Sequence, residues 1–197
     1  MLLAATPYII WDVFFTKQGF WGFNPEYLSG IYLFSLPIEE WLFFITIPYA
    51  CVFTHYTIQI LGYNLELNRK SANRLNLIVL GLSFIIMVAF INLAYTAIAM
   101  LFVIIILFIA ITVNRPLLTS YYITYIIILV PFFIVNGILT GTGIENEIVW
   151  YNDTQNLGIR LGTIPIEDLS YAFSLILLNI VLFEWLAAKW SVRLMES

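Results

Sequence analysis

Hydrophobic residues occur in long runs along this chain, and short polar or aromatic stretches separate the runs. Several runs approach 20 residues, about the length that a helix needs to cross ~30 Å of hydrocarbon. The pattern therefore predicts an all-α fold, a polytopic transmembrane bundle of six helices. The predicted helices cover residues 1–15, 37–61, 74–92, 95–113, 117–139 and 165–188.

The composition supports one membrane domain over residues 1–197. The chain is 62% hydrophobic and 10% charged, whereas a soluble domain carries about 25% charged residues. We therefore expect a lipid bilayer around it, and the few basic residues exclude a nucleic-acid-binding surface. Cys51 is the single cysteine, so an internal disulfide and a multi-cysteine metal site are excluded. No metal or cofactor is predicted.

The basic residues are predicted to gather at one end of the bundle. Alternation of the helices separates six of them from two: Arg69, Lys70, Arg74, Arg115, Lys189 and Arg193 from Lys17 and Arg160. By the positive-inside rule, the end with six faces the cytoplasm. The longer connections at 16–36 and 140–164 then lie on the outer side.

An internal repeat is the more informative feature. Pro-Ile-Glu-Glu at residues 37–40 recurs as Pro-Ile-Glu-Asp at residues 165–168, and Pro7 to Asp12 matches Pro131 to Asn136. Matching proline and acidic positions in one order predict a parallel duplication. We assign repeat unit one to about 1–61, a linking helix to about 74–92, and repeat unit two to about 95–188.

The repeat also predicts a longer N-terminus. The offset of the first match places the start of helix one about seven residues before Met1. We therefore expect that a fuller form has seven helices. The odd linking helix would let both units point the same way across the membrane.

Paired carboxyl groups at the starts of two helices are the candidate catalytic groups: Glu39 and Glu40, then Glu167 and Asp168. Adjacent helical residues point about 100° apart, so at most one of each pair faces the bundle centre squarely. Asp12 lies within reach of them. Acidic residues in a first helical turn also simply stabilise the helix dipole. Two pairs at equivalent places, with charges costly in a membrane, favour a functional site.

Other chemistries are poorly supported. The single histidine, His55, lies far from the acidic pairs and is expected to be packed or solvated. No acyl-transfer triad or dinucleotide-binding pattern occurs, which leaves proton chemistry on an apolar substrate. One alternative is a membrane transporter or a lipid- or isoprenoid-binding protein, with carboxylates that relay protons or hold cations. A third class is an accessory subunit without turnover. A transporter could have broken helices at Pro48 and Pro131, although simple kinks are the more usual effect of proline.

Several segments closely resemble the membrane-type lycopene cyclase family, whose halves are separate subunits in some bacteria and fused elsewhere. They are Trp11-Asp12, Gly-Phe-Trp-Gly-Phe-Asn-Pro at 19–25, Leu-Pro-Ile-Glu-Glu-Trp-Leu-Phe-Phe at 36–44 and Ile-Pro-Tyr-Ala-Cys-Val-Phe at 47–53. The resemblance covers nearly the whole chain. It implies an intramolecular lyase or isomerase of a bacterial or archaeal cytoplasmic membrane that cyclises lycopene without net redox change. The second motif departs from the family pattern, because Asp168 replaces a glutamate.

This chemistry needs a proton donor and a proton acceptor. A protonated carboxyl would protonate the terminal alkene of lycopene or a related polyene, and a second carboxylate would remove a ring proton. We predict Glu39 or Glu40 together with Glu167 as the principal pair, with Asp168 and Asp12 in support.

Aromatic side chains are predicted to surround the passing cation. The candidates for binding substrate are Trp11, Trp21, Phe23, Trp41, Trp150, Tyr151 and Tyr171. Aromatic belts at membrane interfaces are the ordinary alternative. Tyr171 is the strongest candidate because it follows Glu167 by four residues, on the same helical face.

Overall fold

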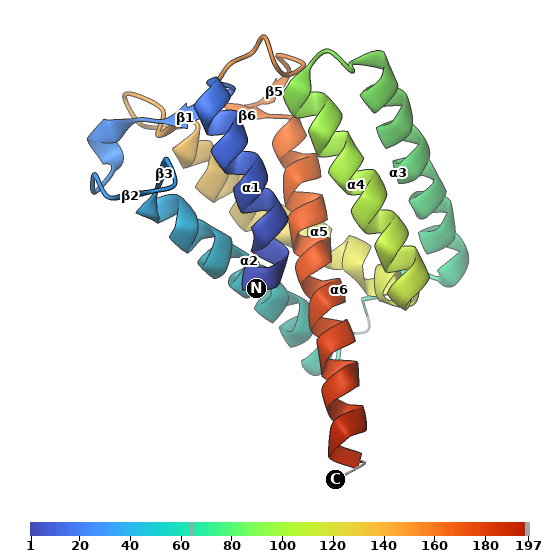
Figure 1. Cartoon of the computed structure of the whole chain (residues 1–197). Helices are drawn as coiled ribbons and strands as arrows, with labels where there is room; N and C mark the ends of the chain where they lie inside the picture. Colours follow the sequence, from blue (N-terminus) through green and yellow to red (C-terminus); the bar gives the residue numbers. More distant parts are fainter. Residues whose placement is uncertain (64, 196–197) are drawn as a thin grey trace.

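In the part of the chain that the structure describes, six helices form one bundle, and short strands lie at one end of it (Figure 1). The computed structural model describes residues 1–63 and 65–195, with side chains to residue 189. The helices are α1 (Leu2–Gln18), α2 (Ile38–Ile60), α3 (Arg69–Ala89), α4 (Ala94–Asn114), α5 (Leu117–Leu139) and α6 (Glu167–Met195). Within the described residues, α2 to α6 are long and apolar enough to cross a membrane. The predicted all-α polytopic bundle is confirmed.

Helix α3 begins five residues earlier than the sequence pattern predicts. Asn68 caps its first turn, because the Oδ1 atom of Asn68 accepts a hydrogen bond from the Ser71 N–H at 2.9 Å. Asparagine is among the best helix caps. The polar segment from residue 69 to 73 is therefore the first turn of a helix and not part of the preceding loop.

The prolines lie differently from the prediction. Two of the predicted helices begin at Pro37 and Pro165, whereas in the structure α2 begins after Pro37, at Ile38, and Pro165 ends a strand two residues before α6. Pro37 has an extended ψ of 150°, which sets the angle at which the chain enters α2. Helices α2 and α5 continue through Pro48 and Pro131, so neither is a broken helix of the transporter kind.

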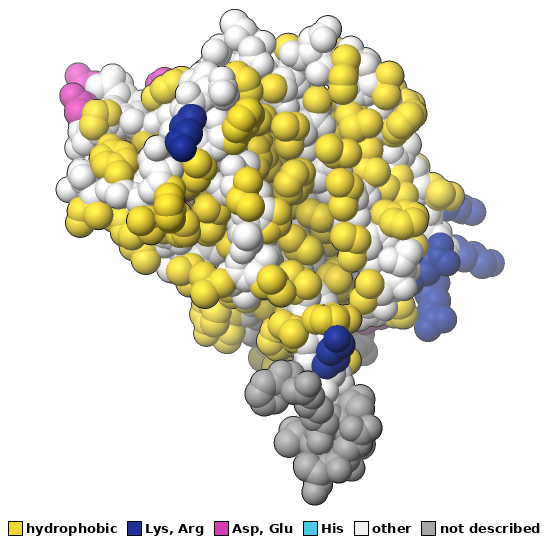
Figure 2. Space-filling model, in the orientation of Figure 1, with side chains coloured by type: hydrophobic (Ala, Val, Ile, Leu, Met, Phe, Trp, Pro, Cys, Tyr) yellow, Lys and Arg dark blue, Asp and Glu magenta, His cyan; other side chains and the backbone are white. Residues whose placement is uncertain are grey.

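Helix α6 occupies the centre of the bundle. It packs along α4, which packs along α3, and on its other side it contacts α1, α2 and α5. The largest fully buried apolar side chains include Tyr8, Phe15, Leu107, Leu118, Tyr121, Leu177 and Ile180. Hydrophobic side chains are spread widely over the face that Figure 2 shows, and large apolar side chains such as Ile10, Phe53 and Phe108 are exposed.

Lysine and arginine side chains gather mainly toward the end opposite the strands (Figure 2). Arg69 begins α3, and Arg115 lies between α4 and α5, both at that end of the bundle. Lys17, near the end of α1, and Arg160, in a strand, lie at the other end. The side chain of Arg193 lies outside the described side chains. Which end faces the cytoplasm stays a prediction.

The strands among the described residues form three short antiparallel pairs. The first joins distant segments, β1 (Trp21–Phe23) and β4 (Val149–Tyr151). The other two are hairpins: β2 (Tyr32–Leu33) with β3 (Leu36–Pro37), and β5 (Arg160–Leu161) with β6 (Ile164–Pro165). Strands β4, β5 and β6 each begin 128 positions after β1, β2 and β3.

The backbone hydrogen bonds recur at the same spacing. The Ile38 N–H donates to the Ile31 carbonyl at 2.9 Å, and the Ile166 N–H donates to the Ile159 carbonyl at 3.0 Å. This recurrence agrees with the predicted repeat, while the division into two units and a linking helix stays a prediction.

The pairing of β1 with β4 relates the two copies by a local twofold axis. Gly22 lies opposite Trp150, its own equivalent 128 positions later, so the register is unchanged when the copies are exchanged. Helices α2 and α6 contact each other, and each also contacts α1 and α5. An axis between α2 and α6 gives this arrangement, and it brings equivalent side chains to a common centre.

Candidate active site

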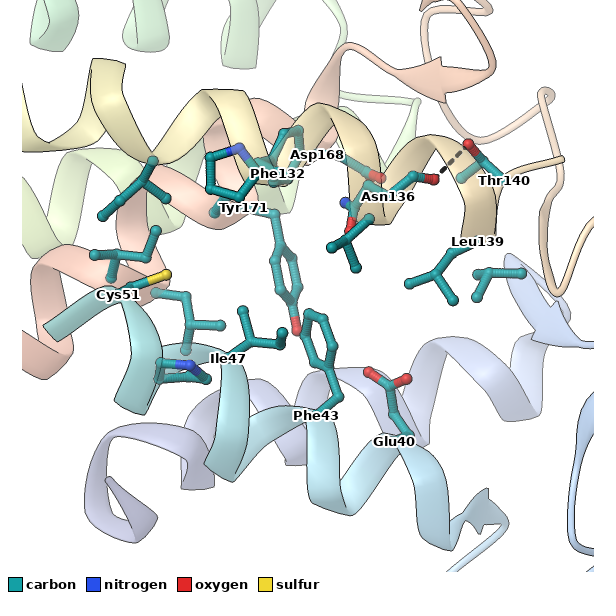
Figure 3. Close-up of a pocket in the computed structure, with 18 of the residues that line it drawn as sticks. Glu40, Phe43, Ile47, Cys51, Phe132, Asn136, Leu139, Thr140, Asp168 and Tyr171 are labelled. Carbon is teal, nitrogen blue, oxygen red and sulfur yellow. Dashed lines mark hydrogen bonds between the residues drawn. The ribbon is translucent and has the colours of Figure 1, made fainter. Parts of the chain in front are cut away.

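A mainly apolar chamber of about 200 Å³ lies among α1, α2, α5 and α6 (Figure 3). On α2 its lining extends from Glu40 to Thr54, about 21 Å at 1.5 Å per residue. The lining residues Ala50, Pro131 and Val135 are exposed and lie on α2 and α5. The chamber is therefore an elongated groove that opens sideways between these two helices.

Three carboxyl side chains lie at the strand end of the chamber. Glu40 points in from α2, while Asp168 on α6 and Asn136 on α5 lie on the opposite wall (Figure 3). Asp12, from α1, also lines the chamber, and Asp12 and Asp168 are only 2% and 4% exposed. Glu40 and Asp168 are equivalent positions of the two copies, as are Asp12 and Asn136. The local twofold axis thus produces four polar side chains at one end of an apolar space.

Asp168 is held by two phenols. Its Oδ1 atom accepts a short hydrogen bond from the Tyr95 hydroxyl, and its Oδ2 atom accepts one from the Tyr151 hydroxyl at 3.1 Å. Burial, and then the neighbouring charge of Asp168, raise the pKa of Tyr151 well above its ordinary value. Tyr151 therefore stays a neutral hydrogen-bond donor at every physiological pH.

Asp12 is held by an indole. Its Oδ1 atom accepts a hydrogen bond from Trp21 Nε1 at 2.6 Å and a longer one from Thr16 Oγ1 at 3.3 Å. The second oxygen, Oδ2, is buried and has no partner among the described residues. The bond to Trp21 joins α1 to β1, so it fixes the indole at the chamber wall.

The first acid of each pair lies outside the chamber. The Glu39 Oε1 atom accepts the Ser29 N–H at 2.8 Å, and the Glu167 Oε1 atom accepts the Leu157 N–H at 2.8 Å. Thr96 Oγ1 also donates to Glu167 Oε1, at 2.6 Å. Each acid thus ties the loop before a hairpin to the helix after it. Of the predicted principal pair, Glu40 reaches the chamber and Glu167 does not.

Four of the predicted aromatic residues line the chamber: Trp21, Phe23, Tyr151 and Tyr171. Tyr171 and Phe43 project into the space in Figure 3. Aromatic rings thus line the same chamber as the carboxyl groups.

The other three predicted rings lie outside the lining. Trp11 packs behind it, with ring centroids 5.0 Å from Tyr171 and 6.0 Å from Trp21. Trp150 covers Gly22, where an added Cβ would lie 2.4 Å from the indole. Trp41 donates from Nε1 to the Leu33 carbonyl at 3.1 Å and is half-buried.

Tyr95 and Phe43 are site residues that the sequence pattern does not identify. Tyr95, at the start of α4, is 3% exposed, and its hydroxyl reaches Asp168 across the helix interface. It follows a tight turn and has no equivalent in the first repeat. Phe43 follows Glu40 by three residues, so the helical spacing could have indicated it.

His55 is a packed residue, in line with the prediction. It is fully buried, and its ring nitrogens bond to Thr124 Oγ1 and Gln59 Nε2, both at 2.8 Å. Across the described part of the chain, no three His, Cys, Asp or Glu side chains form a group that could hold a metal ion.

A sequence model of the family described as lycopene cyclase matches residues 1–58 and 92–186. All residues that line the chamber lie within these two stretches. The unmatched residues are 59–91, which include all of α3, and 187–197. No curated protein and no solved structure matches the chain.

Proposed function

The chain belongs to the lycopene cyclase family, and we propose that it closes an acyclic end of lycopene, or of a related long polyene, into a six-membered ring. The observation that carries this proposal is the placement of Asp12, Glu40 and Asp168 at one end of an apolar groove. Ring closure of this kind adds one proton and removes another, so it involves no net oxidation or reduction. Carboxyl groups alone can supply both steps.

The shape of the groove suits a long uncharged chain. Below the carboxyl groups, α2 contributes Ile47, Cys51 and Thr54 over successive turns, and its described lining is mostly apolar. A polyene end placed beside Glu40 would leave the rest of the chain along these residues or in the side opening. Binding sites of this kind combine an apolar wall with a few polar groups that fix orientation.

The apolar surroundings suit the proton transfer. Desolvation disfavours the charged form of a carboxyl group, so a carboxyl in such a chamber can keep a proton for the substrate. Exclusion of water also protects the carbocation from capture by hydroxide or water. The two acids could then act on one end group without a competing reaction.

Aromatic rings would stabilise the cation. Trp21, Phe43 and Tyr171 line the same end of the chamber as Glu40. A desolvated cation over an aromatic face gains about 2 kcal/mol, which corresponds to roughly a 30-fold faster step if the gain is realised only in the transition state.

We place the protein in the cytoplasmic membrane of a bacterium or archaeon. The basic end would face the cytoplasm, and the carboxyl end would then lie near the outer leaflet. The substrate would enter from the bilayer through the side opening between α2 and α5, because a long polyene is dissolved in the lipid.

The test is expression of the full chain in bacteria that accumulate lycopene, with pigments separated by chromatography. We expect ring-bearing products, their loss in Glu40→Gln, and their retention in the matched control Glu145→Gln, an exposed loop acid. Unchanged lycopene beside a well-inserted protein would overturn the proposal and favour a transporter or a lipid- or isoprenoid-binding protein.

A second experiment tests the groove. Cys51→Trp fills the chamber below the carboxyl groups, so we expect it to reduce ring formation at least tenfold, equivalent to about 1.4 kcal/mol. Phe53→Trp is the control, because Phe53 is 62% exposed on the outer face of the same helix. Both proteins are checked for a single monodisperse peak after extraction. Equal activity of the two folded variants would contradict binding of the polyene in this groove.

A further inference from the structure

The three carboxyl groups of the chamber differ in their hydrogen bonds, and Asp168 has the most complete set. Both of its oxygens accept phenolic hydrogens, from Tyr95 and from Tyr151. A carboxylate is an acceptor at both oxygens, whereas a protonated carboxyl is a donor at one of them. Hydrogen bonds donated to both oxygens therefore stabilise the ionised form of Asp168.

Glu40 has the opposite surroundings. It has no hydrogen-bond partner among the residues that the structure describes, and its chamber neighbours include Phe43 and Ile47. Asp12 and Asp168 line the same end of the chamber, and each is negative when ionised. An ionised Glu40 would have no donor and would meet two like charges, whereas a protonated Glu40 has a hydrogen free for the substrate.

Asp12 has a structural role. Its Oδ1 atom holds the Trp21 indole, and its equivalent in the second copy, Asn136, is an amide that neither donates nor takes up a proton in this pH range. The twofold symmetry of the site is therefore broken in two ways, by the amide and by the phenols that bind Asp168. Such differences separate the functions of otherwise equivalent groups.

We infer that Glu40 is the proton donor of ring closure, that Asp168 is the proton acceptor, and that Tyr95 is a positioning residue for Asp168. This inference rests on the proposed function and divides its chemistry between two residues. Tyr151 contributes to the same positioning by donating a hydrogen bond to the other oxygen of Asp168, Oδ2.

Ring closure conserves protons and electrons. The O–H bond of Glu40 breaks, and its proton forms a C–H bond at the terminal alkene, which leaves a tertiary cation. The neighbouring alkene attacks this cation and forms the ring C–C bond. A C–H bond beside the new cation then breaks, its electrons form the ring double bond, and the proton passes to Asp168. Return of one proton from Asp168 to Glu40 resets the site.

Solvent deuterium separates the two roles. Membranes that contain the full chain, Glu40→Gln or Asp168→Asn are incubated with lycopene vesicles in D₂O, and product and recovered lycopene are analysed by mass spectrometry. Glu40→Gln should give neither cyclic product nor labelled lycopene. Asp168→Asn should still protonate the substrate. Recovered lycopene should then carry label about tenfold above the background measured with Glu40→Gln, or the cyclic product should have an altered double-bond position.

These measurements test the assignment of donor and acceptor separately from the proposed function. Labelled lycopene or cyclic product from Glu40→Gln would overturn the assignment, as would the absence of both label and product in a folded Asp168→Asn. If the unsubstituted chain itself neither cyclises nor labels lycopene, the proposed function fails instead.

Tyr95→Phe tests the positioning role. Without one of its phenols, Asp168 would approach the cation differently, so we expect the ratio of ring double-bond isomers to change about threefold or more. Tyr122→Phe is the control, because that hydroxyl bonds to Asn76 of α3, outside the chamber. A lower rate with an unchanged isomer ratio in Tyr95→Phe would contradict the positioning role.

Discussion

The buried contact between Thr96 and Glu167 allows a quantitative prediction for Thr96→Val. Thr96 is fully buried, and its Oγ1 atom donates to Glu167 Oε1 at 2.6 Å. Valine has almost the same shape but no hydroxyl donor. Glu167 would then keep only the Leu157 N–H at Oε1, while its Oε2 atom is already without a partner within the described residues.

The expected cost follows from the burial of Glu167. Losing a hydrogen bond to a buried acceptor costs about 1–3 kcal/mol, more when the acceptor is charged. We expect the free energy of unfolding of Thr96→Val to fall by about 2 kcal/mol. For a chain of this length that is a decrease of roughly 4–8 °C in Tm.

Thermal unfolding of the purified protein in detergent, followed by circular dichroism, measures this change. Thr112→Val is the control, because Thr112 lies on the same helix, is exposed, and bonds only to carbonyls of its own helix. We expect the control to lie within about 0.5 kcal/mol of the unsubstituted protein. Equal Tm values for the two variants would refute the interpretation of Glu167 as a group that holds the β5–α6 region in place.

Three further substitutions test the site and the contacts that hold it in place. Gly22→Ala should displace the Trp150 indole from the β1–β4 pair and cost about 1–3 kcal/mol, measured as a lower Tm; an unchanged Tm would contradict the close approach. Glu167→Gln should retain a higher cyclisation activity per folded molecule than Asp168→Asn. The reverse order of activities would indicate that Glu167 takes part in the proton transfers. Tyr121→Phe should cost about 1–2 kcal/mol by loss of a buried 2.5 Å hydrogen bond, with unchanged activity per folded molecule.

The arrangement of helices could be predicted because it depends on local pattern. Apolar runs of membrane length fix where α2, α4, α5 and α6 lie, and the recurring Pro-Ile-Glu motif marks both places where a hairpin leads into a helix. The sequence also restricted each acidic pair to one inward carboxyl group, since neighbours on a helix diverge by about 100°.

The choice within each pair could not be predicted. Whether Glu39 or Glu40 faces inward depends on the rotation of α2 about its axis, which the packing of α1, α5 and α6 determines. Glu39 is directed outward by the Ser29 N–H, a backbone group placed by a loop whose geometry has no local signal. Tyr95 lies 73 positions from Asp168, so their contact appears only when α4 packs on α6.

The side opening between α2 and α5 has a thermodynamic consequence. If Ala50, Pro131 and Val135 face the bilayer, acyl chains can occupy the groove whenever no polyene is present, and substrate binding becomes an exchange of one hydrocarbon for another. Such an exchange gains almost nothing from the hydrophobic effect, since lipid tails are as apolar as the protein wall. Preference for a polyene would then arise from its stiffness, because a rigid rod loses less conformational entropy in a straight groove than a flexible tail does.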